Sequence, residues 1–440
     1  MGIADKIPAL SRSTSLRFAV LFIVLLAQGF PLGMFFFAIP IWLAASDAGP
    51  ASIGGLISAA TLPWTFKLFS GILMDRFTYL PMGKRRAWLI GAQSLIVIAL
   101  LVGAFFNPQP SQIYMLSAIA FSVNTFCAFQ DTAISGLAVD LVPENERARA
   151  NGFILAGEAV GTAIGTILCG VLIARIGIAS AFYGMALFVG LSMTLLLITR
   201  ERPGERLLPW TDGETSEQAR GQVAEGWQTL LKSIWRVMSK KESVLLATAL
   251  GLYGVCYGLY AVIAPVIATQ FGGWSDEDFA TLNGVASLIA GLLGMLVFGL
   301  LIDRVGARLG RTMGMFLYAL VGIVFVVSAP FWQAQIVFVI VVFLAFTSDV
   351  LMRIGAYATA MGFCDEKGAA TQFALFLACA NFGTIASGLI VGWLDALGGE
   401  TLILFSASGA GFGASVLFLI IRDVSPQKDN SKALMEKPAE

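Results

Sequence analysis

The stretch GILMDRFTYLPMGKRR, from Gly71 to Arg86, has a shorter copy, GLLIDRVGARLGR, from Gly299 to Arg311. The copies share glycine, aspartate and arginine at one spacing: Gly71, Asp75 and Arg76 match Gly299, Asp303 and Arg304. Each follows a long apolar run, where a membrane-spanning helix would reach water. A loop that only anchors a helix has no need to recur, so the second copy indicates that the chain consists of two repeats.

The composition is that of a protein built for lipid. Of 440 residues, 57% are hydrophobic and 13% are charged, whereas an ordinary soluble domain has roughly 25% charged residues. Apolar runs of about 20 residues recur, each long enough to cross a bilayer as a helix. These runs are continuous rather than alternating, which favours helices over a barrel. The sequence therefore predicts an all-α polytopic membrane protein.

Twelve spans are predicted, six on each side of a polar linker. Those of the first half are Phe18 to Leu43, Ile53 to Met74, Trp88 to Phe106, Ile113 to Leu141, Phe153 to Ala174 and Ile178 to Ile198. Those of the second half are Val244 to Ile267, Phe279 to Ile302, Met313 to Ser328, Ile336 to Met361, Ala369 to Leu394 and Thr401 to Ile421. The expected domains are a tail 1–17, a six-helix bundle 18–198, a linker 199–243, a second six-helix bundle 244–421 and a tail 422–440.

The linker and the first span of each half add detail to this organisation. Large apolar residues recur at helical spacing in the linker between Trp227 and Met238, with basic residues among them, which predicts an amphipathic helix on the membrane surface. We expect it to act mainly as a tether. The repeat extends to the first spans, where Gly29, Gly33 and Pro40 match Gly254, Gly258 and Pro265 at one offset.

Basic residues are unevenly distributed, and this predicts the orientation. All but three of the 28 Lys and Arg fall in the tails, the linker and alternate loops, the exceptions being Lys67, Arg175 and Arg353. Because basic loops stay inside, both termini and the linker are expected in the cytoplasm. The net charge is zero, so nothing indicates a nucleic-acid partner. There is no His, and the five Cys are scattered without metal-ligand spacing, so no metal or cofactor is predicted.

Twelve spans in two repeats with the doubled G-x-x-x-D-R motif resemble the major facilitator superfamily over nearly the whole chain. A finer similarity, to the branch of AmpG-type muropeptide permeases, acetyl-coenzyme A transporters and short siderophore importers, rests on QGFPLG (28–33), LPWTFKLFSGILMDR (62–76) and QDTAISGLAVD followed by ERARANG. In that branch an acidic residue often follows the QD pair about four positions on, where this chain has Ser135.

The resemblance implies two pseudo-symmetric bundles that alternate around a central cavity lined by spans four and ten. It also implies that Asp75 meets the start of span eleven near Ala369, and Asp303 the start of span five near Ala150. Helix N-termini carry partial positive charge, so each Asp would hold the opposite bundle while the cytoplasmic side is shut. Under this hypothesis Gly71, Asp75, Arg76, Gly299, Asp303 and Arg304 form a cytoplasmic latch, and Asp75→Ala favours the inward-open state.

Ionisable residues inside predicted spans supply the candidate site, because a charge at the bilayer centre costs at least about 2.5 to 3.5 kcal/mol. Five are good candidates: Lys67, Asp131, Glu158, Asp349 and Arg353. Two polar neighbours join them: Asn124 shares a helix face with Asp131, and Tyr357 follows Arg353 by one turn. The functional hypothesis is that the bases meet anionic substrate groups while Asp131, Glu158 or Asp349 carries a coupling proton. The alternative is that Lys67 with Asp131 or Glu158, and Asp349 with Arg353, only neutralise buried charge.

Among function classes, a secondary active transporter of the inner membrane fits best. No GxxxxGK[ST] loop is present, so ATP drive within this chain has no support. The absence of His excludes Ser–His and His-based acyl transfer, so we do not expect an enzyme. A non-transporting membrane sensor is the alternative of another class. Proton coupling is then the natural prediction, and the AmpG-like resemblance implies uptake by a protein that we expect to act as a monomer. The intramembrane acids and bases fit a bulky, partly anionic solute such as an anhydro-muropeptide, as do Trp64, Tyr253, Tyr257 and Tyr260. The other substrate hypothesis is a siderophore or another amphiphilic small molecule, imported or exported.

Overall fold

The computed structural model describes residues 8–77, 79–142, 147–215, 235–364 and 369–422, and nearly all regular structure within them is helical. The predicted spans of the first half correspond to α1 with α2, α3 with α4, and then α5, α6, α7 and α8. Their bounds are α1 Thr14–Gly33, η3 Met34–Ala38, α2 Ile39–Ala45, α3 Pro50–Thr65, α4 Lys67–Arg76, α5 Arg86–Phe106, α6 Ile113–Leu141, α7 Arg147–Arg175 and α8 Ile178–Ile198.

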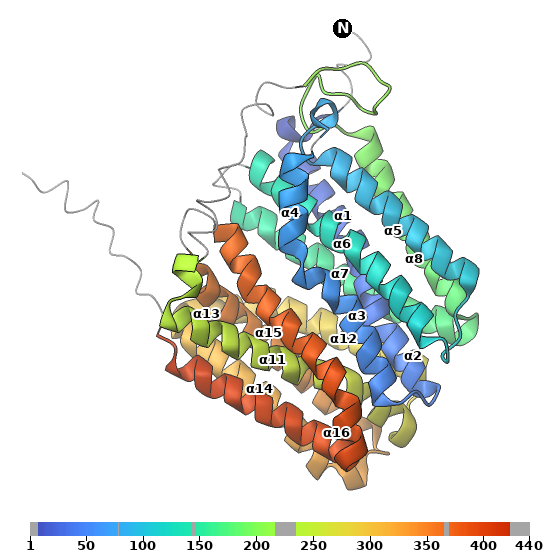
Figure 1. Ribbon diagram of the computed structural model, residues 1–440, viewed down its shortest axis with the longest axis vertical. Coiled ribbons are helices and arrows are strands. Elements are labelled where there is room, and N and C mark those ends of the chain that lie inside the picture. The colour runs from blue at the N-terminus through green and yellow to red at the C-terminus, as the bar shows by residue number, and fades with distance from the viewer. Residues whose placement is uncertain (1–7, 78, 143–146, 216–234, 365–368, 423–440) are drawn as a thin grey trace, which may run out of the picture.

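The second half repeats this order. Its elements are α11 Lys241–Val266, η6 Ile267–Phe271, α12 Asp276–Leu293, η7 Gly294–Phe298, α13 Gly299–Val305, α14 Ala307–Val327, α15 Gln335–Phe363 and α16 Ala369–Ile420. Short 3-10 turns lie at η2 Leu10–Arg12, η4 Leu80–Met82 and η8 Ala329–Phe331. Figure 1 shows α1 to α8 together in one bundle and α11 to α16 in a second. The nearly all-helical structure of the described residues confirms the predicted all-α class.

Ten helical segments of the described chain are individually long and apolar enough to cross a membrane. Two features account for the difference from the twelve predicted spans. First, α16 holds two helices, because Gly398 and Gly399 break its helical backbone and the φ of Gly399, 58°, lies in the left-handed region. Second, α3 and α4 are each short, but together they cover the predicted second span.

The first span of each half is interrupted in a similar way. A π-helical turn, η3, precedes Pro40, and a second, η6, begins two residues after Pro265. Proline removes a backbone hydrogen bond inside a helix, and a π turn accommodates the resulting irregularity. The predicted repeat of Pro40 and Pro265 is therefore matched by a repeated backbone feature. α3 also ends just after a proline, Pro63, and its last turn is closed by Phe66 N donating to the carbonyl of Pro63 at 3.2 Å.

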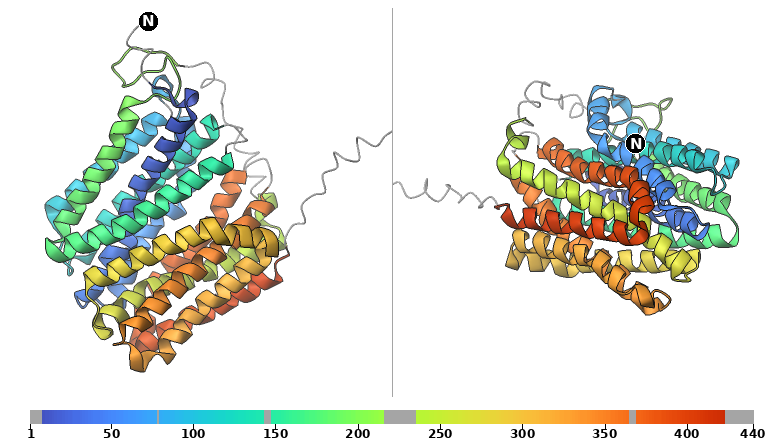
Figure 2. Two further views of the ribbon diagram at one scale, coloured as in Figure 1. Left: turned by 180° about the vertical axis from the view of Figure 1, so that it is seen from behind. Right: turned by 60° about the horizontal axis from the view of Figure 1, so that its bottom comes forward.

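The bundles meet mainly through α3 with α16 and α7 with α12, helices that lie side by side in Figures 1 and 2. Small residues allow this approach: a methyl group at Gly170 would lie 2.5 Å from the Cβ of Ala280, and one at Gly54 2.6 Å from Val391. Arg175 and Glu277 form an ion pair across the interface at 2.6 Å. We call the end that carries this pair the closed end.

At the other end, which we call the basic end, two arginines are fully buried, Arg86 and Arg311. Arg86 donates to the carbonyl of Leu196 at 2.8 Å, at the end of α8. Arg311 donates to the carbonyls of Phe418 and Ile421, at 3.3 and 2.8 Å, at the end of α16. Final carbonyls of a helix lack helical partners, so each arginine satisfies the last turn of its own half. The sequence assigned Arg86 only to membrane orientation, and this packing role is an addition to that prediction.

The start of the linker is packed rather than loose. Glu201 is buried and accepts the backbone N–H groups of Lys84, Arg85 and Arg86, at 2.9, 2.6 and 2.5 Å. The predicted tether therefore begins with a firm attachment to the loop between spans two and three. Most of the predicted amphipathic helix lies outside the described residues; the described remainder, 235–238, is helical, with Val237 buried and Trp235 exposed.

Candidate functional site

The first half of the candidate site is centred on Asp131 of α6. Its Oδ2 pairs with Nζ of Lys67, and its Oδ1 accepts a hydrogen bond from Nε2 of Gln28 at 3.1 Å. Both oxygens of the carboxylate are thus engaged, one by a cation and the other by a neutral donor. Lys67 reaches this position as the first residue of α4, directly after the break at Phe66 that follows Pro63.

Neighbouring polar groups hold this pair in place. Gln130 donates to the carbonyl of Val24 at 3.1 Å and to Oε1 of Gln28 at 3.2 Å, which fixes the amide of Gln28. Asn124 does not contact Asp131, although both lie on the predicted face of α6; it accepts a hydrogen bond from the indole of Trp64 at 3.0 Å. Nζ of Lys67 lies 6.0 Å from the centre of the Trp64 ring, within the range of a cation–π contact.

The second half of the site is centred on Asp349 of α15. Its Oδ2 pairs with Arg353 at 2.7 Å, and its Oδ1 accepts a hydrogen bond from the Tyr253 hydroxyl at 2.7 Å. The geometry repeats that of Asp131, with one oxygen on a cation and the other on a neutral donor from the first span of the same half. Tyr357, one turn beyond Arg353, packs edge-to-face against Phe373.

The acids are buried while the bases are more accessible. Side-chain exposure is 12% for Asp131 and 7% for Asp349, against 31% for Lys67 and 42% for Arg353. An isolated cation inside a membrane protein is costly, and a hydrogen-bonded carboxylate beside it lowers that cost. Each base is therefore stabilised by its buried acid, while the exposed part of the base can bind another group.

Glu158 of α7 differs from the two aspartates. Within the described part of the chain its carboxyl makes no hydrogen bond and no ion pair of contact distance, and the electrostatic influences on it come from Lys67 and Arg353. Its backbone carbonyl lies against Gly29 of α1, where a methyl group would approach to 2.5 Å. Gln28, the next residue, holds Asp131, so Glu158 and Asp131 lie at one level on two sides of α1.

The predicted latch is only partly described. The side chains of Asp75, Arg76 and Asp303 lie outside the described residues, and Arg304 is exposed. A methyl group at Gly71 would find Thr132 at 3.6 Å, and one at Gly299 would find the carbonyl of Gly294 at 3.7 Å, both ordinary contacts. Neither glycine is in close approach to the opposite bundle here, and the latch stays a prediction.

The sequence analysis named Tyr253 only as an aromatic residue suited to the solute and did not name Gln28, so neither was predicted as a hydrogen-bond donor to an aspartate, although a signal was present. Gly29 and Gly254 were matched as repeat positions, and Gln28 and Tyr253 immediately precede them. A polar side chain at corresponding places in both repeats could have marked them.

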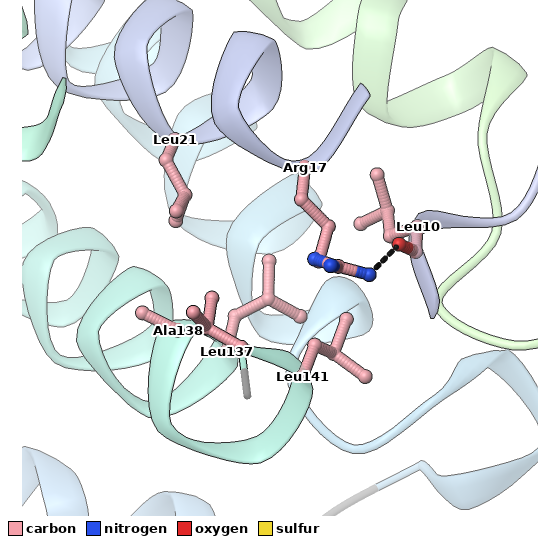
Figure 3. A pocket seen from close by; sticks show the side chains of 7 residues that line it. Leu10, Arg17, Leu21, Leu137, Ala138 and Leu141 are labelled. Carbon is pink, nitrogen blue, oxygen red and sulfur yellow. Dashed lines mark hydrogen bonds between the residues drawn. The ribbon is translucent and has the colours of Figure 1, made fainter. Parts of the chain in front are cut away.

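A small pocket elsewhere in the protein is not a candidate substrate site. It lies at the basic end between α1 and α6, where Leu10, Leu21, Leu137 and Leu141 surround the stem of Arg17 (Figure 3). Its volume is about 10 Å³, the lower limit for one water molecule. The Arg17 guanidinium turns to the carbonyl of Leu10 at 3.1 Å.

Two helical bundles, each with a buried aspartate paired to a base inside its spans, are the features of a polytopic membrane transporter. The chain matches the family model of the Major Facilitator Superfamily over residues 21–388 and again over 246–439, and it belongs to this family.

Curated relatives at low identity refine the comparison. The chain is 24% identical over 425 residues to the anhydromuropeptide permease of Escherichia coli K12, covering 92% of this chain and 80% of the relative. It is 24% identical over 400 residues to a putative transporter, AmpG 4, of Rickettsia felis, covering 86% and 91%. A choline/ethanolamine transporter of Danio rerio, flvcr2b, is 23% identical over 404 residues, covering 86% and 79%.

Solved structures confirm the fold. The nucleoside transporter NupG superposes with a TM-score of 0.71 at 13% identity, covering 92% of this chain and 98% of that one. A POT family transporter in complex with a thioalcohol-conjugated peptide gives a TM-score of 0.67 at 13% identity, covering 92% and 95%.

Proposed function

We propose that this protein is a proton-coupled importer of a bulky, partly anionic solute such as an anhydro-muropeptide. It would act as a monomer in the inner membrane, with both termini in the cytoplasm. The observation that carries the proposal is the matched pair of partly exposed cations, Lys67 in one bundle and Arg353 in the other, each backed by a buried aspartate. An anionic solute held between the bundles could contact both.

We expect transport by alternating access, and the arrangement of the two bundles supports this part of the proposal. Within the described residues, the bundles are joined at the closed end, where Gln270 donates to the carbonyl of Ala44 at 3.0 Å and Arg175 pairs with Glu277. If basic residues mark the cytoplasmic side, the closed end faces outward, and this conformation is inward-facing. Rocking of the bundles about the central charges would then expose Lys67 and Arg353 to each side in turn.

The named function of the Escherichia coli relative supports an anhydro-muropeptide as the first substrate to test. An aromatic siderophore is the second candidate, because Tyr253 lies among aromatic rings, with ring centres 6.0 Å from Tyr257 and 6.4 Å from Tyr318. Stacking contacts of this kind also suit an aromatic ligand.

Purified protein in liposomes with an imposed inward proton gradient tests the proposal. We expect labelled anhydro-muropeptide to accumulate, and an excess of unlabelled compound to compete, while a catecholate siderophore and choline do not. Competition by the siderophore alone would move the assignment to the second candidate. Absence of gradient-dependent accumulation of either compound would contradict proton-coupled import of these solutes. The non-transporting membrane sensor would then remain as the alternative of another class.

A further inference from the structure

We propose that Glu158 is the residue that carries the coupling proton, and that its ionised form competes with an anionic substrate for Lys67 and Arg353. This inference rests on the proposed function and assigns the proton to one of its three candidate acids. The contrast in bonding among those acids carries the argument.

Asp131 and Asp349 are poorly suited to exchange protons in this state. Each has one oxygen paired with a cation and the other accepting a hydrogen bond, from Gln28 at 3.1 Å or Tyr253 at 2.7 Å. An adjacent cation and hydrogen bonds to the charged form both favour the ionised carboxylate. Protonation of either acid would break this set of contacts and leave its base unpaired, which is costly inside a membrane.

Glu158 has no such set of contacts within the described chain. Both its oxygens are without a hydrogen bond there, and an ionised carboxylate inside a membrane without donors is costly. A proton can therefore bind it without disrupting an existing bond. The groups that act on it electrostatically are Lys67 of α4 and Arg353 and Tyr357 of α15.

Of the helices that contact α7, α6 carries Asp131, which is paired with Lys67, and Tyr114 and Asp140 near its ends. On the other helices the titratable side chains lie towards the ends and are Arg17 on α1, Tyr183 on α8, and Asp276, Glu277 and Asp278 on α12. The charged groups that act on Glu158 are therefore Lys67 and Arg353, and they belong to different bundles.

The residue that follows Glu158 lies on the interface between the bundles. A methyl group placed at Gly291 of α12 would lie 3.5 Å from the Cβ of Ala159, the next residue along α7. Glu158 thus lies next to a contact between the bundles and between cations of both. An ionised Glu158 attracts Lys67 and Arg353 together, whereas a protonated one leaves both to an anionic solute.

In the proposed transport cycle, the proton that enters with the solute also leaves with it. A proton from the outer solution binds a carboxylate oxygen of Glu158, the solute binds Lys67 and Arg353, and after reorientation the solute and the same proton leave to the inner solution. Coupling between two binding equilibria acts equally in both directions. If protonation of Glu158 favours binding of the solute, bound solute must also favour protonation of Glu158.

Glu158→Gln, which imitates the protonated form, tests the assignment in the liposome assay with labelled anhydro-muropeptide. We expect the variant to lose gradient-driven accumulation at least tenfold while still exchanging internal labelled for external unlabelled compound. Glu158→Asp, which keeps a carboxyl group, should retain accumulation. Asp395→Asn, a carboxylate of α16 outside both clusters, should behave as wild type. Accumulation by Glu158→Gln at the wild-type level would overturn the assignment, and so would loss of exchange together with accumulation.

A substrate-free measurement separates this inference from the proposed function. Infrared difference spectra between acidic and alkaline pH should contain a protonated-carboxyl band in wild type that is absent in Glu158→Gln and present in Asp395→Asn. Persistence of all carboxyl bands in Glu158→Gln would contradict the inference whatever the substrate. If wild type transports neither candidate solute, the proposed function fails while the spectra still decide the role of Glu158.

Discussion

Gln28 of α1 and Tyr253 of α11 occupy corresponding positions in the two halves of the chain, and each donates a hydrogen bond to the buried aspartate of its own bundle. The distances are 3.1 Å from Gln28 to Asp131 and 2.7 Å from Tyr253 to Asp349. The repeat has therefore kept a function, the positioning of a carboxylate beside a base, while changing the chemistry of the donor from amide to phenol.

Removing the phenol should weaken transport without unfolding the protein. A hydrogen bond to a charged group contributes about 1.5 to 3 kcal/mol, so Tyr253→Phe is expected to lower the ratio kcat/KM for uptake by roughly ten- to a hundredfold. Tyr183→Phe, on an exposed tyrosine of α8, is the control and should change uptake little. Equal rates in Tyr253→Phe and wild type would mean that the donor has no part in the site.

Loss of the acid itself should be more severe. Asp349→Asn leaves Arg353 without its partner at 2.7 Å, and an unpaired charge inside a membrane-spanning bundle is costly. We expect uptake by this variant to fall to background in liposomes. Cys169→Ser, at a buried cysteine of α7 outside both clusters, should transport nearly normally. Small and equal effects of the two substitutions would favour a purely structural role for the pair.

The ion pair at the closed end should bias the conformation only modestly. Arg175 is exposed and Glu277 is partly exposed, and exposed ion pairs contribute little because water and salt screen them. Glu277→Gln is expected to increase, by up to about fivefold, the labelling rate of a cysteine placed at Ala51, which faces Gly392 across the interface. Asp278→Asn, a neighbouring acid bonded within its own turn, is the control. An unchanged rate in Glu277→Gln would exclude this pair as a determinant of closure.

The attachment of the linker should depend on both oxygens of Glu201. Oε1 accepts the amides of Arg85 and Arg86 and Oε2 that of Lys84, so in Glu201→Gln an NH₂ group would face an amide donor. An unsatisfied buried donor costs about 1 to 3 kcal/mol, and we expect a lower Tm in detergent by differential scanning fluorimetry. Glu214→Gln, on an exposed side chain, should leave the Tm unchanged. An equal Tm for the two variants would show that the contact contributes nothing to stability.

The spans could be predicted closely because apolar length sets them directly. α6 and α8 have the predicted bounds, Ile113–Leu141 and Ile178–Ile198. The break at Phe66 was missed because its cause, Pro63, lies inside an apolar run where hydropathy stays high. The packing of Glu201 was missed because a polar, glycine-rich sequence gives no signal of a distant partner.

The candidate site was predicted in its charges but not in its donors. A charge inside a span is conspicuous in sequence, so Lys67, Asp131, Asp349 and Arg353 could be found, and the pairing of Asp349 with Arg353 follows from helical spacing. Uncharged polar residues such as Gln28 and Tyr253 do not stand out in a sequence. They become hydrogen-bond donors to the aspartates only because α1 packs on α6 and α11 on α15. The structure also separates Asn124 from Asp131 and assigns it to Trp64.

The most direct test of the account is accumulation of labelled anhydro-muropeptide by proteoliposomes under an inward proton gradient, in wild type and in Lys67→Gln/Arg353→Gln. The account predicts accumulation by wild type that a protonophore abolishes, and none by the double variant. Accumulation by the double variant at the wild-type rate would contradict the claim that these two cations form the substrate site.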